Sequence, residues 1–83
     1  MNEYITLNRL RVGESATVLD VCGESSMVQR LKDIGLTEGT RVDCLMRSPL
    51  GDPVAYLIRG AVIALRKEDS QNVSVTEVSY GVQ

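Results

Sequence analysis

The chain has 83 residues, of which 43% are hydrophobic, and its 9 basic and 11 acidic side chains give a net charge of −2. This length predicts one small globular domain, residues 1–83. The absence of His excludes Ser-His-Asp and Cys-His nucleophile systems and His-ligated metal centres. The slightly acidic balance argues against binding nucleic acid through its phosphates and against a polybasic membrane anchor. The composition therefore favours a non-enzymatic domain.

The amino end shows no basic stretch followed by an apolar one, so no signal peptide is predicted. The longest uninterrupted apolar run, residues 61–65, is far shorter than the ~20 residues that span a bilayer. We expect a cytoplasmic protein in which Cys22 and Cys44 are free thiols. Both cysteines stand in apolar strand patterns, which predicts that each packs as a small core residue.

One helix of about two to three turns is predicted, and it needs a sheet to dock on because it is too short to be stable alone. Ser26 and Gln29 stand three positions apart and fit a capping box at its start. Apolar residues recur at helical spacing through Leu31. Gly35 supplies a left-handed stop, after which Leu36 can fold back onto Leu31 as in a Schellman cap.

The rest of the chain is predicted to be mainly β. Apolar alternation and β-branched runs predict five strands, at residues 15–22, 40–47, 54–59, 61–66 and 73–78. Turns are expected at residues 7–10, capped by Thr6, and at residues 67–72, where one turn of 3₁₀ helix fits, and residues 79–83 are expected to fray. We expect a small SH3-like five-stranded barrel with the helix inserted after the first strand. An OB-like topology is the alternative.

The loop at residues 48–53 is the best candidate for a working surface. It contains two prolines around a glycine, so its backbone is stiff and presents Leu50 at a low cost in entropy. In the alternative interpretation, the connection simply needs these backbone angles and Leu50 packs on the core.

Four basic residues stand at the ends of predicted strands: Arg47, Arg59, Arg66 and Lys67. In the simpler interpretation they serve solubility. In the other, they gather at one rim of the barrel, as a docking patch for an acidic partner or to present an arginine to a nucleotide hydrolase.

The aromatic content argues against two other kinds of binding. Grooves for proline-rich peptides and surfaces that stack nucleic-acid bases need several aromatic rings, and this chain has three tyrosines and no Phe or Trp. No metal-ligand spacing appears, so neither a metal nor a cofactor is expected.

Three segments, in this order, resemble the FeoA family, ferrous iron transport protein A. They are Arg30-Leu31-x-Asp33-x-Gly35-Leu36-x-x-Gly39-x-x-Val42, then Pro49-Leu50-Gly51-Asp52-Pro53, then Arg59-Gly60 followed by Ala64-Leu65-Arg66. The resemblance spans residues 7–78. It implies a small cytosolic SH3-like protein that accompanies FeoB, a membrane ferrous iron permease with a cytosolic GTP-binding domain.

The resemblance predicts an accessory protein for ferrous iron uptake that binds or regulates the cytosolic region of FeoB and meets the membrane only through this partner. We expect the contact residues to be Leu36, Arg47, Leu50 and Asp52. Two other functions are alternatives: stimulating GTP hydrolysis by the partner, or carrying ferrous iron through the two thiols and carboxylates. The missing histidines make the carrier the weakest of the three. A barrel edge could also pair two copies in a weak homo-oligomer.

Overall fold

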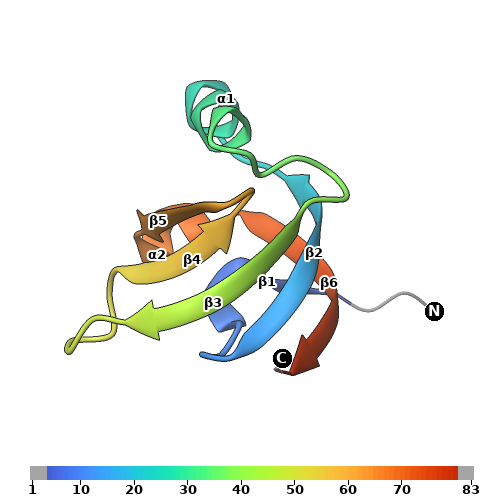
Figure 1. Cartoon of the computed structure of the whole chain (residues 1–83). Coiled ribbons are helices and arrows are strands. Elements are labelled where there is room, and N and C mark those ends of the chain that lie inside the picture. Colours follow the sequence, from blue (N-terminus) through green and yellow to red (C-terminus); the bar gives the residue numbers. More distant parts are fainter. Residues whose placement is uncertain (1–3, 81–83) are drawn as a thin grey trace.

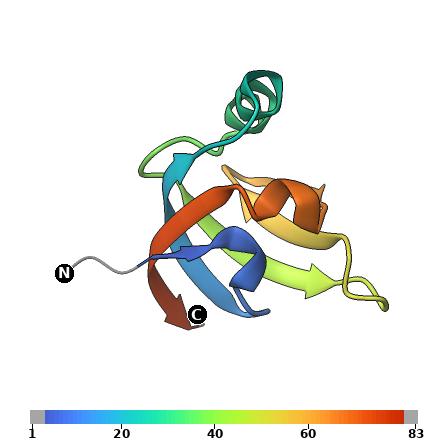
Figure 2. The ribbon, with the colours of Figure 1, turned by 180° about the vertical axis from the view of Figure 1, so that it is seen from behind.

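The computed structural model describes residues 4–80. They form one antiparallel sheet with the strand order β1-β6-β2-β3-β4-β5, rolled into a small barrel (Figure 1). The strands are β1 (Ile5–Thr6), β2 (Glu14–Val21), β3 (Arg41–Arg47), β4 (Val54–Ile58), β5 (Ala61–Leu65) and β6 (Val73–Tyr80). The helices are the 3₁₀ helix η1 (Leu7–Arg9), α1 (Ser25–Asp33) and the short α2 (Lys67–Ser70). α1 stands at one end of the barrel, whereas η1 and α2 contact each other on the side seen in Figure 2.

The core fills the inside of the barrel because successive side chains of a strand point to opposite faces. In β4, Val54, Tyr56 and Ile58 are buried, and the residues between them are only half-buried. Tyr56 is the largest fully buried side chain of the described residues. Around it pack residues from η1 and from the other strands, including Leu7, Leu10, Val18, Val42, Cys44, Val73 and Val75. The strand alternation read from the sequence therefore corresponds to a real inner face.

A sixth strand corrects the predicted count of five. The mainly β barrel with one helix between strands is confirmed. However, β1 precedes the predicted first strand and pairs with β6, Ile5 opposite Val75 and Thr6 opposite Ser74. Two residues are too few to show strand alternation in a sequence. The helix therefore follows the second strand, β2, instead of the first.

The start of α1 also differs from the prediction. Glu24 is the N-cap, and its carboxylate accepts hydrogen bonds from Ser26 Oγ at 2.5 Å and from the Met27 N–H at 3.2 Å. Gln29 instead donates from Nε2 to Asp33 Oδ1 at 2.9 Å, so the predicted capping box is wrong. α1 starts at Ser25, so Ser26 already lies in the first turn of the helix and is not its N-cap. These two hydrogen bonds lower the pKa of Glu24 because they stabilise its charged form, and the bond from Ser26 has the larger effect.

The end of α1 confirms the predicted Schellman cap. The N–H groups of Gly35 and Leu36 donate to the carbonyls of Lys32 at 3.0 Å and Leu31 at 3.1 Å. Gly35 has a φ of +113°, in the left-handed region that glycine adopts without strain. A Cβ at this position would also lie 2.7 Å from Cδ of Arg59 and 3.0 Å from Cγ2 of Ile58, so another residue would require these side chains to shift.

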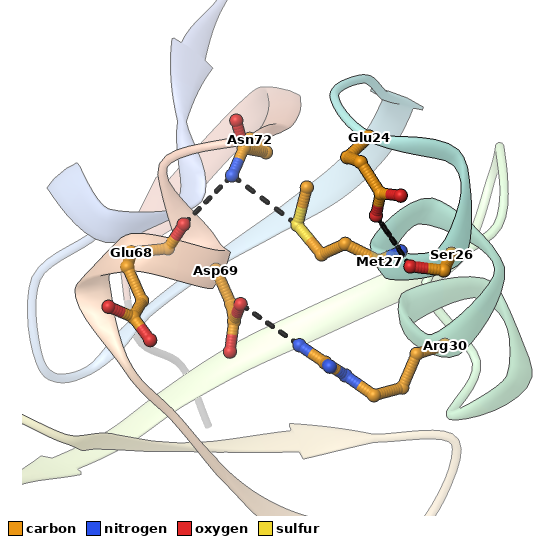
Figure 3. A network of polar contacts seen from close by, with 7 residues as sticks. All are labelled: Glu24, Ser26, Met27, Arg30, Glu68, Asp69 and Asn72. Carbon is orange, nitrogen blue, oxygen red and sulfur yellow. Dashed lines mark hydrogen bonds and ion pairs between the residues drawn. The ribbon is translucent and has the colours of Figure 1, made fainter.

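Polar contacts join α1 to α2 and the turn that follows it, and we call them the α1–α2 seam (Figure 3). Arg30 Nη2 forms a salt bridge with Asp69 Oδ1 at 3.1 Å. Asn72 Nδ2 donates to the Glu68 carbonyl at 2.8 Å and lies 3.5 Å from Met27 Sδ. The seam therefore adds polar contacts at the surface to the nine-residue helix, whose Leu31 is buried in the core.

The last part of the chain is more regular than predicted. β6 continues to Tyr80, which lies opposite Glu14 of β2. The predicted frayed tail, residues 79–83, therefore starts too early, and residues 81–83 lie outside the described part. Residues 67–70 form the α-helical turn of α2 where a 3₁₀ turn was expected.

The two cysteines occupy different environments. Both are free thiols, as predicted. Cys44 is buried in the core as expected, and this burial raises the pKa of its thiol. Cys22 is exposed, which corrects the prediction that it is a core residue. A register shift between Val18 and Asp20 turns Val21 inward in place of Asp20, so strand alternation directs Cys22 outward.

Candidate functional site

A cleft of about 350 Å³ lies beside the loop at residues 48–53, and we call it the loop cleft. It is bordered by the end of β3, the start of β4, η1 and α2. Its lining residues are Asn8, Arg47, Leu50, Gly51, Asp52, Val54, Tyr56, Lys67 and Ser70. Because four elements of the fold contribute these residues, the core fixes most of the walls and the loop supplies the rim.

The deepest lining residues belong to the core. Tyr56 is 0% exposed, and its hydroxyl donates to the Leu7 carbonyl at 3.3 Å. Burial raises the pKa of Tyr56 to about 12 because the protein interior disfavours the phenolate. Ser70 is also buried. These two residues therefore shape the cleft and stay uncharged near neutral pH.

The loop itself is a tight turn with its leucine directed outward. The Gly51 N–H donates to the Ser48 carbonyl at 2.8 Å, and the Ser48 N–H donates to the Pro53 carbonyl at 3.1 Å. Gly51 has a φ of +89°, which glycine tolerates. Leu50 is 95% exposed. The alternative in which Leu50 packs on the core is therefore excluded.

Asp52 anchors the loop to α2. Its Oδ1 accepts a hydrogen bond from the Lys67 N–H at 2.8 Å. This amide opens α2 and has no partner within the helix, while the N-cap residue, Arg66, makes no side-chain cap bond. Asp52 thus caps α2 from fifteen positions upstream. The bond fixes the loop relative to the barrel and so sets the position of Leu50.

Two cationic side chains line the cleft. Arg47 donates from Nη2 to the Leu10 carbonyl at 3.1 Å, which uses one of the five N–H donors of a guanidinium. The backbone N–H of Lys67 donates to Asp52, and Lys67 is exposed. In the part of the chain that the structure describes, neither cation has a salt bridge.

Asn8, in η1, is a lining residue that the sequence did not single out. Its Oδ1 is buried and has no hydrogen-bond partner among residues 4–80. A buried acceptor left unsatisfied costs about 1–3 kcal/mol. One Asn in a short polar turn carries no local signal of this kind, because its burial depends on strands far along the chain.

Three of the four predicted contact residues come together in the loop cleft: Arg47, Leu50 and Asp52. The prediction for Leu36 is wrong in this fold, since Leu36 is 0% exposed and belongs to the core. The Schellman cap turns it inward.

The other basic residues of the predicted rim do not line the cleft. Arg59 donates from Nη1 to Thr40 Oγ1 at 3.4 Å at the α1 end of the barrel, and Arg66 precedes α2. The predicted gathering of four cations is thus reduced to Arg47 and Lys67.

Residues 4–80 contain no group of three His, Cys, Asp or Glu side chains placed to hold a metal ion. No helix in the same range is long and apolar enough to cross a membrane.

The sequence matches a family model described as the FeoA domain over residues 5–77. A relative in Porphyromonas gingivalis, a Fe(2+) transport protein A/Fe(2+) transporter FeoB fusion protein, is 30% identical over 73 residues. These residues make up 88% of this chain and 9% of the relative, so the chain corresponds to a small part of that protein.

Solved structures share the fold. The NMR structure of a FeoA-like protein from Clostridium acetobutylicum superposes with a TM-score of 0.85 at 26% identity, covering 100% of this chain and 98% of that one. The crystal structure of Stenotrophomonas maltophilia FeoA, complexed with zinc and described as an SH3 domain protein, gives a TM-score of 0.82 at 24% identity, covering 92% and 96%. The predicted SH3-like fold is therefore confirmed.

Proposed function

The chain belongs to the FeoA family, and we propose that it is a cytoplasmic, non-catalytic accessory protein for ferrous iron uptake that binds the cytosolic region of a FeoB-type transporter through the loop cleft. The observation that carries this proposal is the exposed Leu50 beside Arg47, on a loop that Asp52 anchors to α2. A fixed, solvent-exposed leucine next to a cation is a surface suited to recognising another protein, because little entropy is lost on binding.

The fused relative supports the choice of partner. In the P. gingivalis protein, a FeoA part and a FeoB part belong to one chain. Covalent linkage holds two domains at an effective concentration of about millimolar when the linker is short and flexible. A FeoA domain on a separate chain lacks this advantage, so its association with a transporter depends on a binding surface of its own.

The chemistry of the loop cleft favours binding over catalysis. Its ionisable side chains are those of Arg47, Asp52, Tyr56 and Lys67. Asp52 already caps α2, and Tyr56 holds its proton up to about pH 12. No lining residue pairs a nucleophile with a general base, which group-transfer chemistry requires. An exposed leucine, in contrast, gains from being covered by an apolar surface.

The proposal is tested by measuring the affinity of the purified chain for the isolated cytosolic region of the transporter by biolayer interferometry. Leu50→Asp and Arg47→Glu are each expected to weaken binding about tenfold or more, as substitutions at central contacts do. Val62→Asp, on β5, and Lys32→Glu, on α1, are matched controls at exposed positions outside the cleft. Unchanged affinity in both cleft variants would remove the loop cleft from the proposal.

Measurements of GTP turnover and of iron binding on the same proteins distinguish binding alone from the two alternative functions. If the chain also stimulates the partner, GTP turnover rises on addition of wild-type protein and the rise is lost in Arg47→Glu, the arginine that lines the cleft. If the chain only binds, turnover is the same with and without it. Equilibrium dialysis of the isolated chain against ferrous iron tests the carrier function directly.

A further inference from the structure

The loop cleft is the one region of the described residues that combines unpaired cations, an unpartnered acceptor and a fully exposed leucine. We propose that it binds an extended acidic segment of the partner, in which a carboxylate lies between Arg47 and Lys67. This inference rests on the proposed function and specifies the chemistry of the segment that is recognised.

The charges of the cleft are unbalanced. Arg47 bonds only to a neutral carbonyl, and neither Arg47 nor Lys67 has a salt bridge within residues 4–80. The carboxylate of Asp52 offsets one of the two positive charges, and one of its oxygens is already occupied by the backbone N–H that opens α2. A second carboxylate, brought by a partner, would complete the set with charge-assisted hydrogen bonds.

The cleft also differs in sign from the chain around it. The chain carries a net charge of −2, whereas two of the three charged side chains that line the cleft are cations. The local excess of positive charge in the cleft therefore favours an acidic segment, although the chain as a whole is slightly acidic. Such complementarity acts mainly on the rate and orientation of encounter.

The exposed leucine favours a peptide over a free anion. Leu50 is 95% exposed and lines the cleft together with Arg47, and a free anion offers no apolar group to cover it. A peptide carries an acidic side chain and an apolar neighbour in one segment. The exposed Leu50 can then cover an apolar neighbour of that side chain.

The lining disfavours a proline-rich segment. Domains that bind such segments present several exposed aromatic rings. Tyr56 is the only aromatic residue that lines this cleft, and it is 0% exposed with its hydroxyl bonded to Leu7.

The test is a titration of the ¹⁵N-labelled chain with an acetylated, amidated peptide of sequence Leu-Glu-Ala-Glu-Leu, followed by amide chemical shifts. The matched peptide replaces both Glu by Gln. We expect the amides of Gly51, Lys67 and Ser70 to shift with the Glu peptide only, and its affinity to fall with added salt. Equal shifts with the Gln peptide would overturn the inference. The absence of any shift at about 5 mM peptide would also overturn it, because this concentration fills a large part of a site whose Kd is about 1 mM.

Substitutions of single lysines test whether the Glu peptide binds in the loop cleft. Lys67→Gln leaves the bond from Arg47 to Leu10 intact and is expected to weaken the Glu peptide about threefold to tenfold, consistent with loss of one charge-assisted bond. Lys32→Gln, on α1, is the control and should change nothing. Inorganic phosphate is titrated in parallel. If phosphate moves the same amides as strongly as the peptide, the cleft is a general anion site and the peptide inference is wrong.

Different results would contradict the proposed function and this inference. If the cytosolic region of the transporter binds the wild type and Lys67→Gln equally at all salt concentrations, the acidic segment is wrong and the accessory function remains. If the Glu peptide binds as expected and the transporter region does not, the choice of partner is wrong and the recognition chemistry stands.

Discussion

The two sides of α2 differ in whether the polar groups beside them are paired within the chain. On the side facing α1, Arg30 pairs with Asp69, and the amide of Asn72 contacts both Glu68 and Met27 (Figure 3). On the side facing the loop cleft, two cations have no salt bridge within the described residues. Groups that pair within the chain hold the fold together, whereas the unpaired ones are available to something outside it.

The two sides also differ in what carries their stability. α1 is fixed by the buried Leu31 and Leu36 with polar contacts added at the surface. The loop is held by its own backbone hydrogen bonds and is joined to α2 by one carboxylate–amide bond, and its leucine is almost fully exposed. Substitutions should therefore separate the two sides clearly: apolar changes at the α1 end affect folding, and those at the loop affect binding.

The largest expected effect is at Leu36. Leu36→Ala should lower the free energy of unfolding by about 2–4 kcal/mol, because it removes buried methyl groups and leaves a cavity. Leu50→Ala is the matched control and should change it by no more than about 0.5 kcal/mol. Urea denaturation measures both. Similar losses in the two variants would contradict the division between a structural leucine and an exposed one.

Tyr56 should make the fold sensitive to alkaline pH. Its pKa is raised to about 12 in the folded chain from an ordinary value of 10, so the unfolded chain releases the proton first. The contribution is complete below pH 10, and about 2 kcal/mol should be lost between pH 10 and 12. Tyr56→Phe cannot ionise, so its stability should fall less over this interval. Parallel curves for the two proteins would show that Tyr56 is not the group responsible.

The anchor of the loop should have an intermediate effect. Asp52→Ala removes the acceptor from the Lys67 N–H and should cost about 1 kcal/mol, as loss of a helix cap does. Asp52→Asn keeps an acceptor and should cost less. Both can be followed by urea denaturation, and the amide shifts of Leu50 and Gly51 report whether the loop moves. An unchanged loop in Asp52→Ala would show that the prolines alone hold it.

The smallest effect is expected at the salt bridge of the α1–α2 seam. Arg30 is 62% exposed, so its pair with Asp69 should contribute only about 0.5 kcal/mol. A double-mutant cycle with Arg30→Ala and Asp69→Ala measures this coupling, which should shrink as salt is added. A coupling above about 2 kcal/mol would mean that this pair, and not apolar burial, is what docks α1.

The features that could be predicted from the sequence are local ones. Gly35 marks the end of α1, and two prolines around Gly51 mark the exposed loop, because backbone geometry depends on the residue itself and its neighbours. The strand alternation likewise located the five longer strands. The stiff loop pointed to Leu50 and Asp52, and the basic strand end pointed to Arg47, and the fold then brings all three to one cleft.

What could not be predicted depends on contacts between distant segments. The Schellman cap turns Leu36 back toward α1, but its complete burial depends on the packing of the core, and the two-residue strand β1 exists only because β6 lies beside it. The bond between Asp52 and Lys67 joins a loop to a helix fifteen positions later. The unpartnered Asn8 is likewise visible only once η1, β4 and α2 meet.

The pairing of β1 with β6 has a consequence for how this unit can be built into larger proteins. Ile5 lies opposite Val75, so the first and last strands are neighbours in the sheet, and the loop projects from the other side of the barrel (Figures 1 and 2). Polypeptide joined at either strand would emerge away from Leu50. Such a domain can therefore be joined to another one, as a FeoA part and a FeoB part are in the P. gingivalis protein, while the loop cleft stays open to solvent.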